Sequence, residues 1–284
     1  MIQAFRNFMT RRTISAKARN KVMNSFSNYK IFSDIRVNSE TLRQKEQRPH
    51  EVLYFHKVDD PYSHLTVQCI AKFQSSFDII LKPILVGEEN LDAIHEPSLY
   101  NIYCLRDVQR IAPFYGVNFN AHEYPEKKLI DKANSILSSV KEEDFAKIAS
   151  SVSAALWEDD ADALDELSSS FFSTKKQVRE KLIQGNEIRD AKGYYFGSAF
   201  YYEKELYWGV DRLPHLEERL SDLGAKKSKE CQKICPLELQ APDQLTSDTK
   251  INLYYYPSLN SPYTFVSTKR VRQIREDYSV NLIT

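Results

Sequence analysis

The chain has 284 residues, of which 42% are hydrophobic and 27% are charged, a composition typical of a soluble protein with one or two domains. The chain has 39 lysines and arginines and 39 aspartates and glutamates, so no global basic field should attract nucleic acid or a membrane surface. No apolar run reaches the roughly 20 residues that a membrane-spanning helix needs. Four cysteines are too few for a disulfide framework, which favours a reducing compartment and predicts a cytoplasmic protein.

Residues 1–50 predict a basic helical extension. No acidic residue occurs before Asp34, seven lysines and arginines do, and apolar residues recur at helical spacing. A basic, amphipathic, acid-poor start is also typical of an organelle transit peptide. The helical extension is favoured because the pattern runs past a typical presequence into a polar connector at 36–50.

Residues 51–87 predict a β-α-β unit. The letters EVLYF at 51–55 are an apolar strand, 61–73 is an apolar helix, and FDIILKPILVG at 77–87 is a second strand. Pro83 lies inside that strand, which predicts a bend or an edge position there. A short helix between two apolar strands favours a parallel pair.

Residues 97–190 lose strand character and follow helical periods, so an α-helical insert is expected there. Residues 193–208 then predict strand, turn and strand, followed by a tight turn at Gly209 and a helix with leucines at helical spacing. The order β-α-β, helical insert, β-β-α predicts an α/β domain over 51–222.

The last 62 residues repeat the opening pattern after a linker. Residues 223–249 are polar and interrupted by two prolines. Within 250–284, INLYYYPSLNSPYTFV echoes VLYFHKVDDPYSHL, and Pro262 lies 201 positions after Pro61. A spacing of about one domain length predicts an internal duplication with an incomplete second copy. Two explanations stay open: the chain is a fragment, or the tail docks on another structure.

Several segments together resemble one family. DDPYSHL and NSPYTFV are similar to the Ser-Pro-Tyr-Ser segment of kappa-class glutathione transferases and 2-hydroxychromene-2-carboxylate isomerases, the cysteine-free branch of the DsbA family. KPILVG resembles the next strand of that family, YCLRDVQRIAPFYGVNF its insert helix and connector, and ELYWGVDRLPHLEERL its terminal strand, turn and helix. The resemblance covers about 51–222. It implies a thioredoxin-like fold with an inserted α-helical domain, followed by the start of a second copy.

The resemblance also implies where glutathione would bind. In the family, a serine before the proline directs its hydroxyl at the glutathione sulfur, where a donor and a helix N-terminus both favour the thiolate. Asp60 occupies that position in the first copy and Ser261 in the second. Asp211 matches the aspartate that holds the γ-glutamyl end, and Val210 stands where a serine often precedes it.

The family's cis-proline loop matches FGSAF at 196–200. Ser198 stands at the proline position and follows Gly197. A cis peptide without proline costs about 2.5–4 kcal/mol. This cost favours a trans loop and weakens the expected backbone contact with glutathione.

Asp60 has two interpretations. With Pro61 at the first helical position it is a good N-cap. As an ionised carboxylate it donates no hydrogen bond, and at about 4 Å it would repel a thiolate by about 1–4 kcal/mol. A catalytic Asp60 would therefore act as a general base, or as an acid if burial raised its pKa. His56 and His64 flank it as candidate proton carriers, with packing or surface positions as the alternative.

The leading hypothesis is a glutathione-dependent isomerase or oxidoreductase acting on a small molecule. The alternative is a catalytically degenerate domain that serves as a structural or partner-binding module, as a homodimer or by pairing with a second copy. The departures at Asp60, Val210 and Ser198 favour this alternative. Tyr62 and Trp208 are candidate pocket walls, with core packing as the other interpretation. No metal site is expected, and Asp60 and Asp211 should line one cleft.

Overall fold

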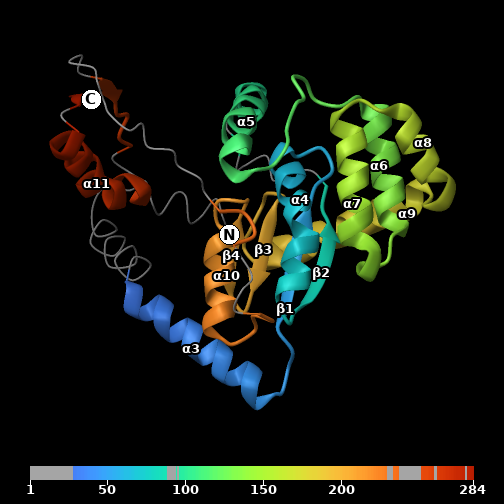
Figure 1. Cartoon of the computed structure of the whole chain (residues 1–284), viewed down its shortest axis with the longest axis horizontal. Coiled ribbons are helices and arrows are strands. Elements are labelled where there is room, and N and C mark those ends of the chain that lie inside the picture. The colour runs from blue at the N-terminus through green and yellow to red at the C-terminus, as the bar shows by residue number, and fades with distance from the viewer. Residues whose placement is uncertain are drawn as a thin grey trace, which may run out of the picture. The chain divides into compact units, whose positions relative to one another are not determined.

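A computed structural model describes residues 28–87, 94, 96–228, 233–236, 251–258, 261–278 and 280–284 (Figure 1). The chain divides into two compact units, Ile35–Leu239 and a second that combines Met1–Asp34 with Gln240–Thr284. The expected basic helix before residue 28 lies outside the described residues. Of the helices that the structure describes, none combines the length and apolar character needed to cross a membrane.

Helix α3 spans Tyr29–Lys45, so most of the polar segment 36–50 is helical. Within the larger unit, Arg36 Nη2 lies 2.6 Å from Glu205 Oε2, a side chain that is 1% exposed. Arg219 Nε lies 2.9 Å from the other carboxylate oxygen. Two guanidinium groups thus compensate for the burial of one carboxylate. These tertiary contacts hold a polar sequence against the domain as a helix.

A four-stranded sheet in the order β2-β1-β3-β4 forms the centre of the larger unit. Strands β1 (Glu51–His56) and β2 (Ile80–Leu85) pair in parallel on either side of α4 (Pro61–Ser76) in the chain. The predicted β-α-β unit is therefore confirmed. Pro83 lies in an edge strand, where a missing N–H is tolerated, as the sequence predicts.

Strand β3 (Ala199–Tyr202) runs antiparallel to β1 and pairs with β4 (Glu205–Trp208), which confirms the predicted hairpin. Gly209 follows with φ +74°, in the left-handed region that glycine adopts without strain. Helix α10 (Leu213–Asp222) then begins. Cys235 lies in the segment predicted as a linker, and its side chain is fully buried in the core of this unit.

Alternation along β1 divides the core between the two faces of the sheet. Val52 and Tyr54 belong to the main apolar cluster, to which α4 and α10 contribute Leu65 and Leu216. Phe55 belongs to a smaller cluster, against which residues of the helix preceding β3 pack. Helices therefore cover both faces of the sheet.

The described residues between β2 and β3 contain five α-helices and one 3-10 helix, in the interval predicted for the helical insert. Their bounds are α5 Pro97–Ile111, η2 Ala112–Tyr115, α6 Lys127–Ser139, α7 Glu142–Trp157, α8 Ala161–Ser170 and α9 Lys175–Ala191. Helices α6, α7 and α8 gather beyond the β2 edge of the sheet, whereas α5 lies near the start of α4 (Figure 1).

Gly185 allows α9 to approach β2 closely. A Cβ at this position would lie 1.8 Å from the carbonyl oxygen of Leu85, a backbone atom that cannot swing aside. We expect Gly185→Ala to lower the free energy of unfolding by about 1–3 kcal/mol through overpacking, despite the better helix propensity of alanine. Urea denaturation measures this change. Gly87→Ala is the matched control, because its Cβ would meet its nearest neighbour at 3.5 Å. Equal losses in the two variants would contradict the proposed contact.

The smaller unit contains a second β-α-β element. Strands β5 (Asn252–Tyr254) and β6 (Asn281–Ile283) are parallel, and α11 (Pro262–Tyr278) connects them. Ser261 directly precedes α11, and its backbone N–H donates to the carbonyl of Ser258 at 2.9 Å. The element order equals that of β1, α4 and β2, while the second thioredoxin-like copy remains a prediction.

Candidate functional site

Asp60 is the N-cap of α4, as the sequence predicts. Its Oδ1 accepts a hydrogen bond from the backbone N–H of Tyr62 at 3.2 Å, and its Oδ2 accepts one from the N–H of Ser63 at 2.9 Å. The Ser63 hydroxyl donates a third bond to Oδ2 at 2.7 Å. Pro61 occupies the start of the helix, where its fixed φ is favourable. The carboxylate of this buried residue therefore stabilises the helix start.

The loop before β3 closes over Asp60. A Cβ on Gly197 would lie 2.8 Å from Lys57 Cβ and 3.0 Å from Asp60 Oδ2, so any larger residue would force the loop to shift. Ser198 is fully buried at φ +54°, and its hydroxyl forms a 2.6 Å hydrogen bond with that of Thr66. No cis peptide bond occurs among the described residues, so this loop is trans. The cost of a non-proline cis peptide accounts for this outcome.

A pocket of about 310 Å³, named the Asp211 pocket here, lies where α5, the start of α4 and the turn before α10 meet. Four residues singled out in the sequence line it, namely Tyr62, Trp208, Val210 and Asp211. Asp60, which was expected in the same cleft, is not among the described residues that line it. The structure thus brings together four of the ten predicted site residues, and it places the Asp60 carboxylate at the helix cap.

Two carboxylates define the polarity of the Asp211 pocket. The hydroxyl of Tyr62 donates to Asp107 Oδ2 at 2.7 Å, and burial together with Asp107 raises the pKa of Tyr62. Asp211 Oδ2 lies 3.7 Å from Arg212 Nη1. Desolvation raises the pKa of Asp211, and Arg212 opposes that rise. The Trp208 indole N–H is buried and has no hydrogen-bond partner within the described part of the chain.

Asp107 was missed in the sequence. It lies in the segment YCLRDVQRI, and the available signal was one acidic residue beside the apolar stripe of a helix. Sequence alone does not reveal that α5 turns this side chain toward Tyr62. Tyr100 of the same helix stacks on Phe196, with ring centroids 5.8 Å apart and planes 10° apart. Helix α5 therefore supplies one wall of the pocket.

His56 and His64 are buried in the core, and neither is among the described residues that line the Asp211 pocket. His64 Nε2 donates to the carbonyl of Asn118 at 3.1 Å, which leaves Nδ1 to accept from the Ser153 hydroxyl at 2.8 Å. Burial lowers the pKa of His64 to about 4 and that of His56 to about 3. Both rings are therefore neutral at pH 7 and act as packing groups.

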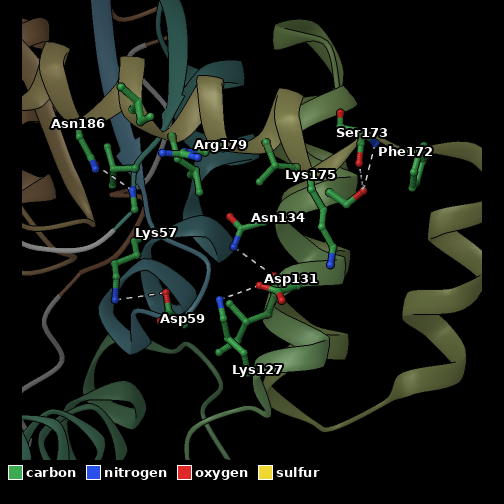
Figure 2. Close-up of a pocket in the computed structure, with 17 residues that line it drawn as sticks. Lys57, Asp59, Lys127, Asp131, Asn134, Phe172, Ser173, Lys175, Arg179 and Asn186 are labelled. Atoms are coloured by element: carbon green, nitrogen blue, oxygen red, sulfur yellow. Dashed lines mark hydrogen bonds and ion pairs between the residues drawn. The ribbon is translucent and has the colours of Figure 1, made fainter.

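A second, larger cavity of about 870 Å³, named the α6–α9 cavity here, lies beyond the carboxyl ends of β1 and β2 (Figure 2). Lys57 and Asp59 from the loop after β1 line one side, and residues of α6 and α9 line the others. None of the ten residues singled out in the sequence is among its described lining. The described residues contain no group of three or more potential metal ligands.

Comparison with known proteins finds chains of similar fold among the solved structures. No family model matches the chain, and no curated protein matches it. A solved structure of 2-hydroxychromene-2-carboxylate isomerase (the selenomethionine protein) is similar over 61% of this chain and 96% of that chain, with 18% sequence identity and a TM-score of 0.46. A likeness of this extent establishes neither a family nor an activity.

Proposed function

We propose that residues 51–222 form a glutathione-binding domain whose γ-glutamyl site is the Asp211 pocket. The observation that carries this proposal is one shared pocket, in which Tyr62 of α4 lies opposite Trp208, Val210 and Asp211, 146 to 149 positions further along the chain. An α-amino acid end needs an acceptor for its ammonium and donors for its carboxylate. Asp211 is the acceptor, while the Arg212 guanidinium is the donor.

The thiol end departs from the family's pattern. Asp60 is an acceptor and would repel a thiolate. The two hydroxyls in the first turn of α4 are already engaged, since Ser63 donates to Asp60 and Tyr62 donates to Asp107. This domain therefore binds glutathione without activating its thiol. The glutathione-dependent isomerase or oxidoreductase activity on a small molecule is assigned to Ser261, in a form of the protein that carries a complete second copy.

A second candidate is a thioredoxin-like domain without small-molecule chemistry, kept for pairing with a second copy or a partner protein. One observation favours it. Asp60 forms three hydrogen bonds within α4, and the hydroxyl of Ser198 is bonded to Thr66. Two of the positions that would hold glutathione thus have a complete structural role.

Calorimetric titration separates the two candidates. We expect reduced glutathione to bind with a millimolar or tighter Kd, and Asp211→Ala to weaken binding at least tenfold by removing a charge-assisted hydrogen bond. S-methylglutathione should bind equally well, because no group here depends on the thiolate. Asp162→Ala, which removes an exposed carboxylate of α8, should leave binding unchanged. No heat of binding with the wild-type chain would favour the second candidate.

A further inference from the structure

The α6–α9 cavity has an excess of positive charge. Four basic and two acidic side chains line it. The acids are paired, since Lys57 Nζ lies 3.2 Å from Asp59 and Lys127 Nζ lies 2.7 Å from Asp131. Figure 2 shows these pairs on the β1 and α6 sides of the cavity.

The remaining two cations, Lys175 and Arg179, have no ion-pair partner among the described residues. They lie four positions apart in α9, so their side chains leave the same face of the helix one turn apart. Lys175 is the first residue of α9, where the helix dipole adds further positive potential. Figure 2 shows the Lys175 ammonium and the Arg179 guanidinium turned to different parts of the cavity, so α9 contributes two separate positive groups to its lining.

The rest of the wall is apolar. Ile130 of α6 and Val178, Leu182 and Ile183 of α9 line the cavity, together with Phe172 from the turn before α9. Ile183 is 47% exposed and Phe172 is 70% exposed, so this apolar surface is incompletely covered by the chain itself. An organic ligand buries such surface favourably, and the volume of about 870 Å³ lies within the range of small-molecule sites.

We propose that the α6–α9 cavity binds a long-chain carboxylate, with the carboxylate on Arg179 and the hydrocarbon chain on the apolar wall. A carboxylate accepts paired N–H bonds from a guanidinium, and Lys175 adds a second positive charge to the same cavity. A cationic head would meet repulsion, and an uncharged head would gain neither the ion pair nor the paired hydrogen bonds. The site is separate from the Asp211 pocket and does not depend on glutathione binding.

The test is calorimetric titration of the whole chain with dodecanoate, below its micellar concentration. Wild-type protein should bind it, whereas the double variant Lys175→Gln/Arg179→Gln should bind at least tenfold more weakly. Lys176→Gln is the matched control, because Lys176 carries the same charge on the next residue of α9 and is not part of the lining. Thermal melting of each variant verifies that it is folded.

Ligand analogues separate the head from the chain. Dodecanol should bind more weakly than dodecanoate and should respond little to the double variant, and acetate should not bind measurably. Ile183→Asn should weaken dodecanoate binding, whereas Leu99→Asn, at a 64% exposed position of α5, should not. The proposal is overturned if dodecanoate does not bind, if dodecyltrimethylammonium binds as tightly, or if Lys176→Gln has the effect of the double variant.

Discussion

Lowering the pH from 7 to 5 should reduce the free energy of unfolding by about 4 kcal/mol, about 2 kcal/mol for each of two buried histidines. Burial lowers the pKa of His56 to about 3, with a contribution from nearby His64, and lowers the pKa of His64 to about 4 despite its hydrogen bonds. In the unfolded chain both titrate near the ordinary value of about 6.5. The unfolded state therefore binds more protons below this value. The stabilisation is complete above about pH 6.5 and is lost as the pH falls toward the folded pKa values.

Urea denaturation at half-unit steps between pH 7 and pH 5 measures this slope. Most carboxylates titrate below this window, so the histidines dominate it, and burial also lowers the pKa of His50, which adds to the slope in the same direction. His56→Leu should remove about 2 kcal/mol of the loss, since leucine keeps an apolar side chain in the core and removes the titration. His215→Gln, at an exposed position, should leave the slope unchanged. A stability that stays constant from pH 7 to pH 5 would show that the two rings are not held neutral.

The sheet was predictable from the sequence because its signals are local. In the first segment, an apolar strand is followed by Pro61 at the start of a helix, which predicts β-α-β. In the second, two short strands are followed by a turn at Gly209, which predicts β-β-α, and both segments occur. The cap at Asp60 was predictable for the same reason, since an N-cap depends only on the next three residues. The edge position of Pro83 follows from its missing N–H.

Features that depend on distant residues could not be predicted. Residues 36–45 are too polar to predict a packed helix, and the ion pair of Arg36 with Glu205 joins positions 169 apart. The role of Asp107 depends in the same way on Tyr62, 45 positions away. The histidines beside Asp60 were candidate proton carriers because of their chemistry, and only their burial shows that they are neutral. Local chemistry thus identified the candidates, and tertiary packing decides which of them are accessible.

The loop after β1 and the first turn of α4 line different cavities. Lys57 and Asp59 of the loop line the α6–α9 cavity, and Tyr62 of α4 lines the Asp211 pocket. Ser63 joins the loop to the helix, since its hydroxyl accepts from the backbone N–H of Lys57 at 3.3 Å and donates to Asp60. Substitutions at Asp60 therefore need a readout for stability as well as one for chemistry.

Ser261→Ala should reduce glutathione-dependent turnover by about 10²–10³-fold in a form of the protein with a complete second copy, because it removes the hydroxyl that we propose as the donor to the thiolate. Asp60→Ala in the same protein should leave turnover in place. It should instead lower the free energy of unfolding by about 0.5–2 kcal/mol through loss of the N-cap. Initial rates with a chromogenic electrophile and urea denaturation measure the two effects. If Asp60→Ala abolishes turnover and Ser261→Ala does not, the two roles are reversed.

Asp60→Ser tests the same assignment in the present chain. Serine caps a helix about as well as aspartate, so Asp60→Ser should lower the free energy of unfolding by less than Asp60→Ala does. The substitution also removes a negative charge, which at about 4 Å costs a thiolate about 1–4 kcal/mol, and it introduces a hydroxyl donor. If glutathione lies in the Asp211 pocket with its sulfur near α4, its thiol pKa should fall in the Asp60→Ser protein. Thiolate absorbance against pH measures this, with Asp60→Ala separating charge removal from the hydroxyl. Glutathione that binds with an equal thiol pKa in the wild-type chain and both variants would place the sulfur away from residue 60.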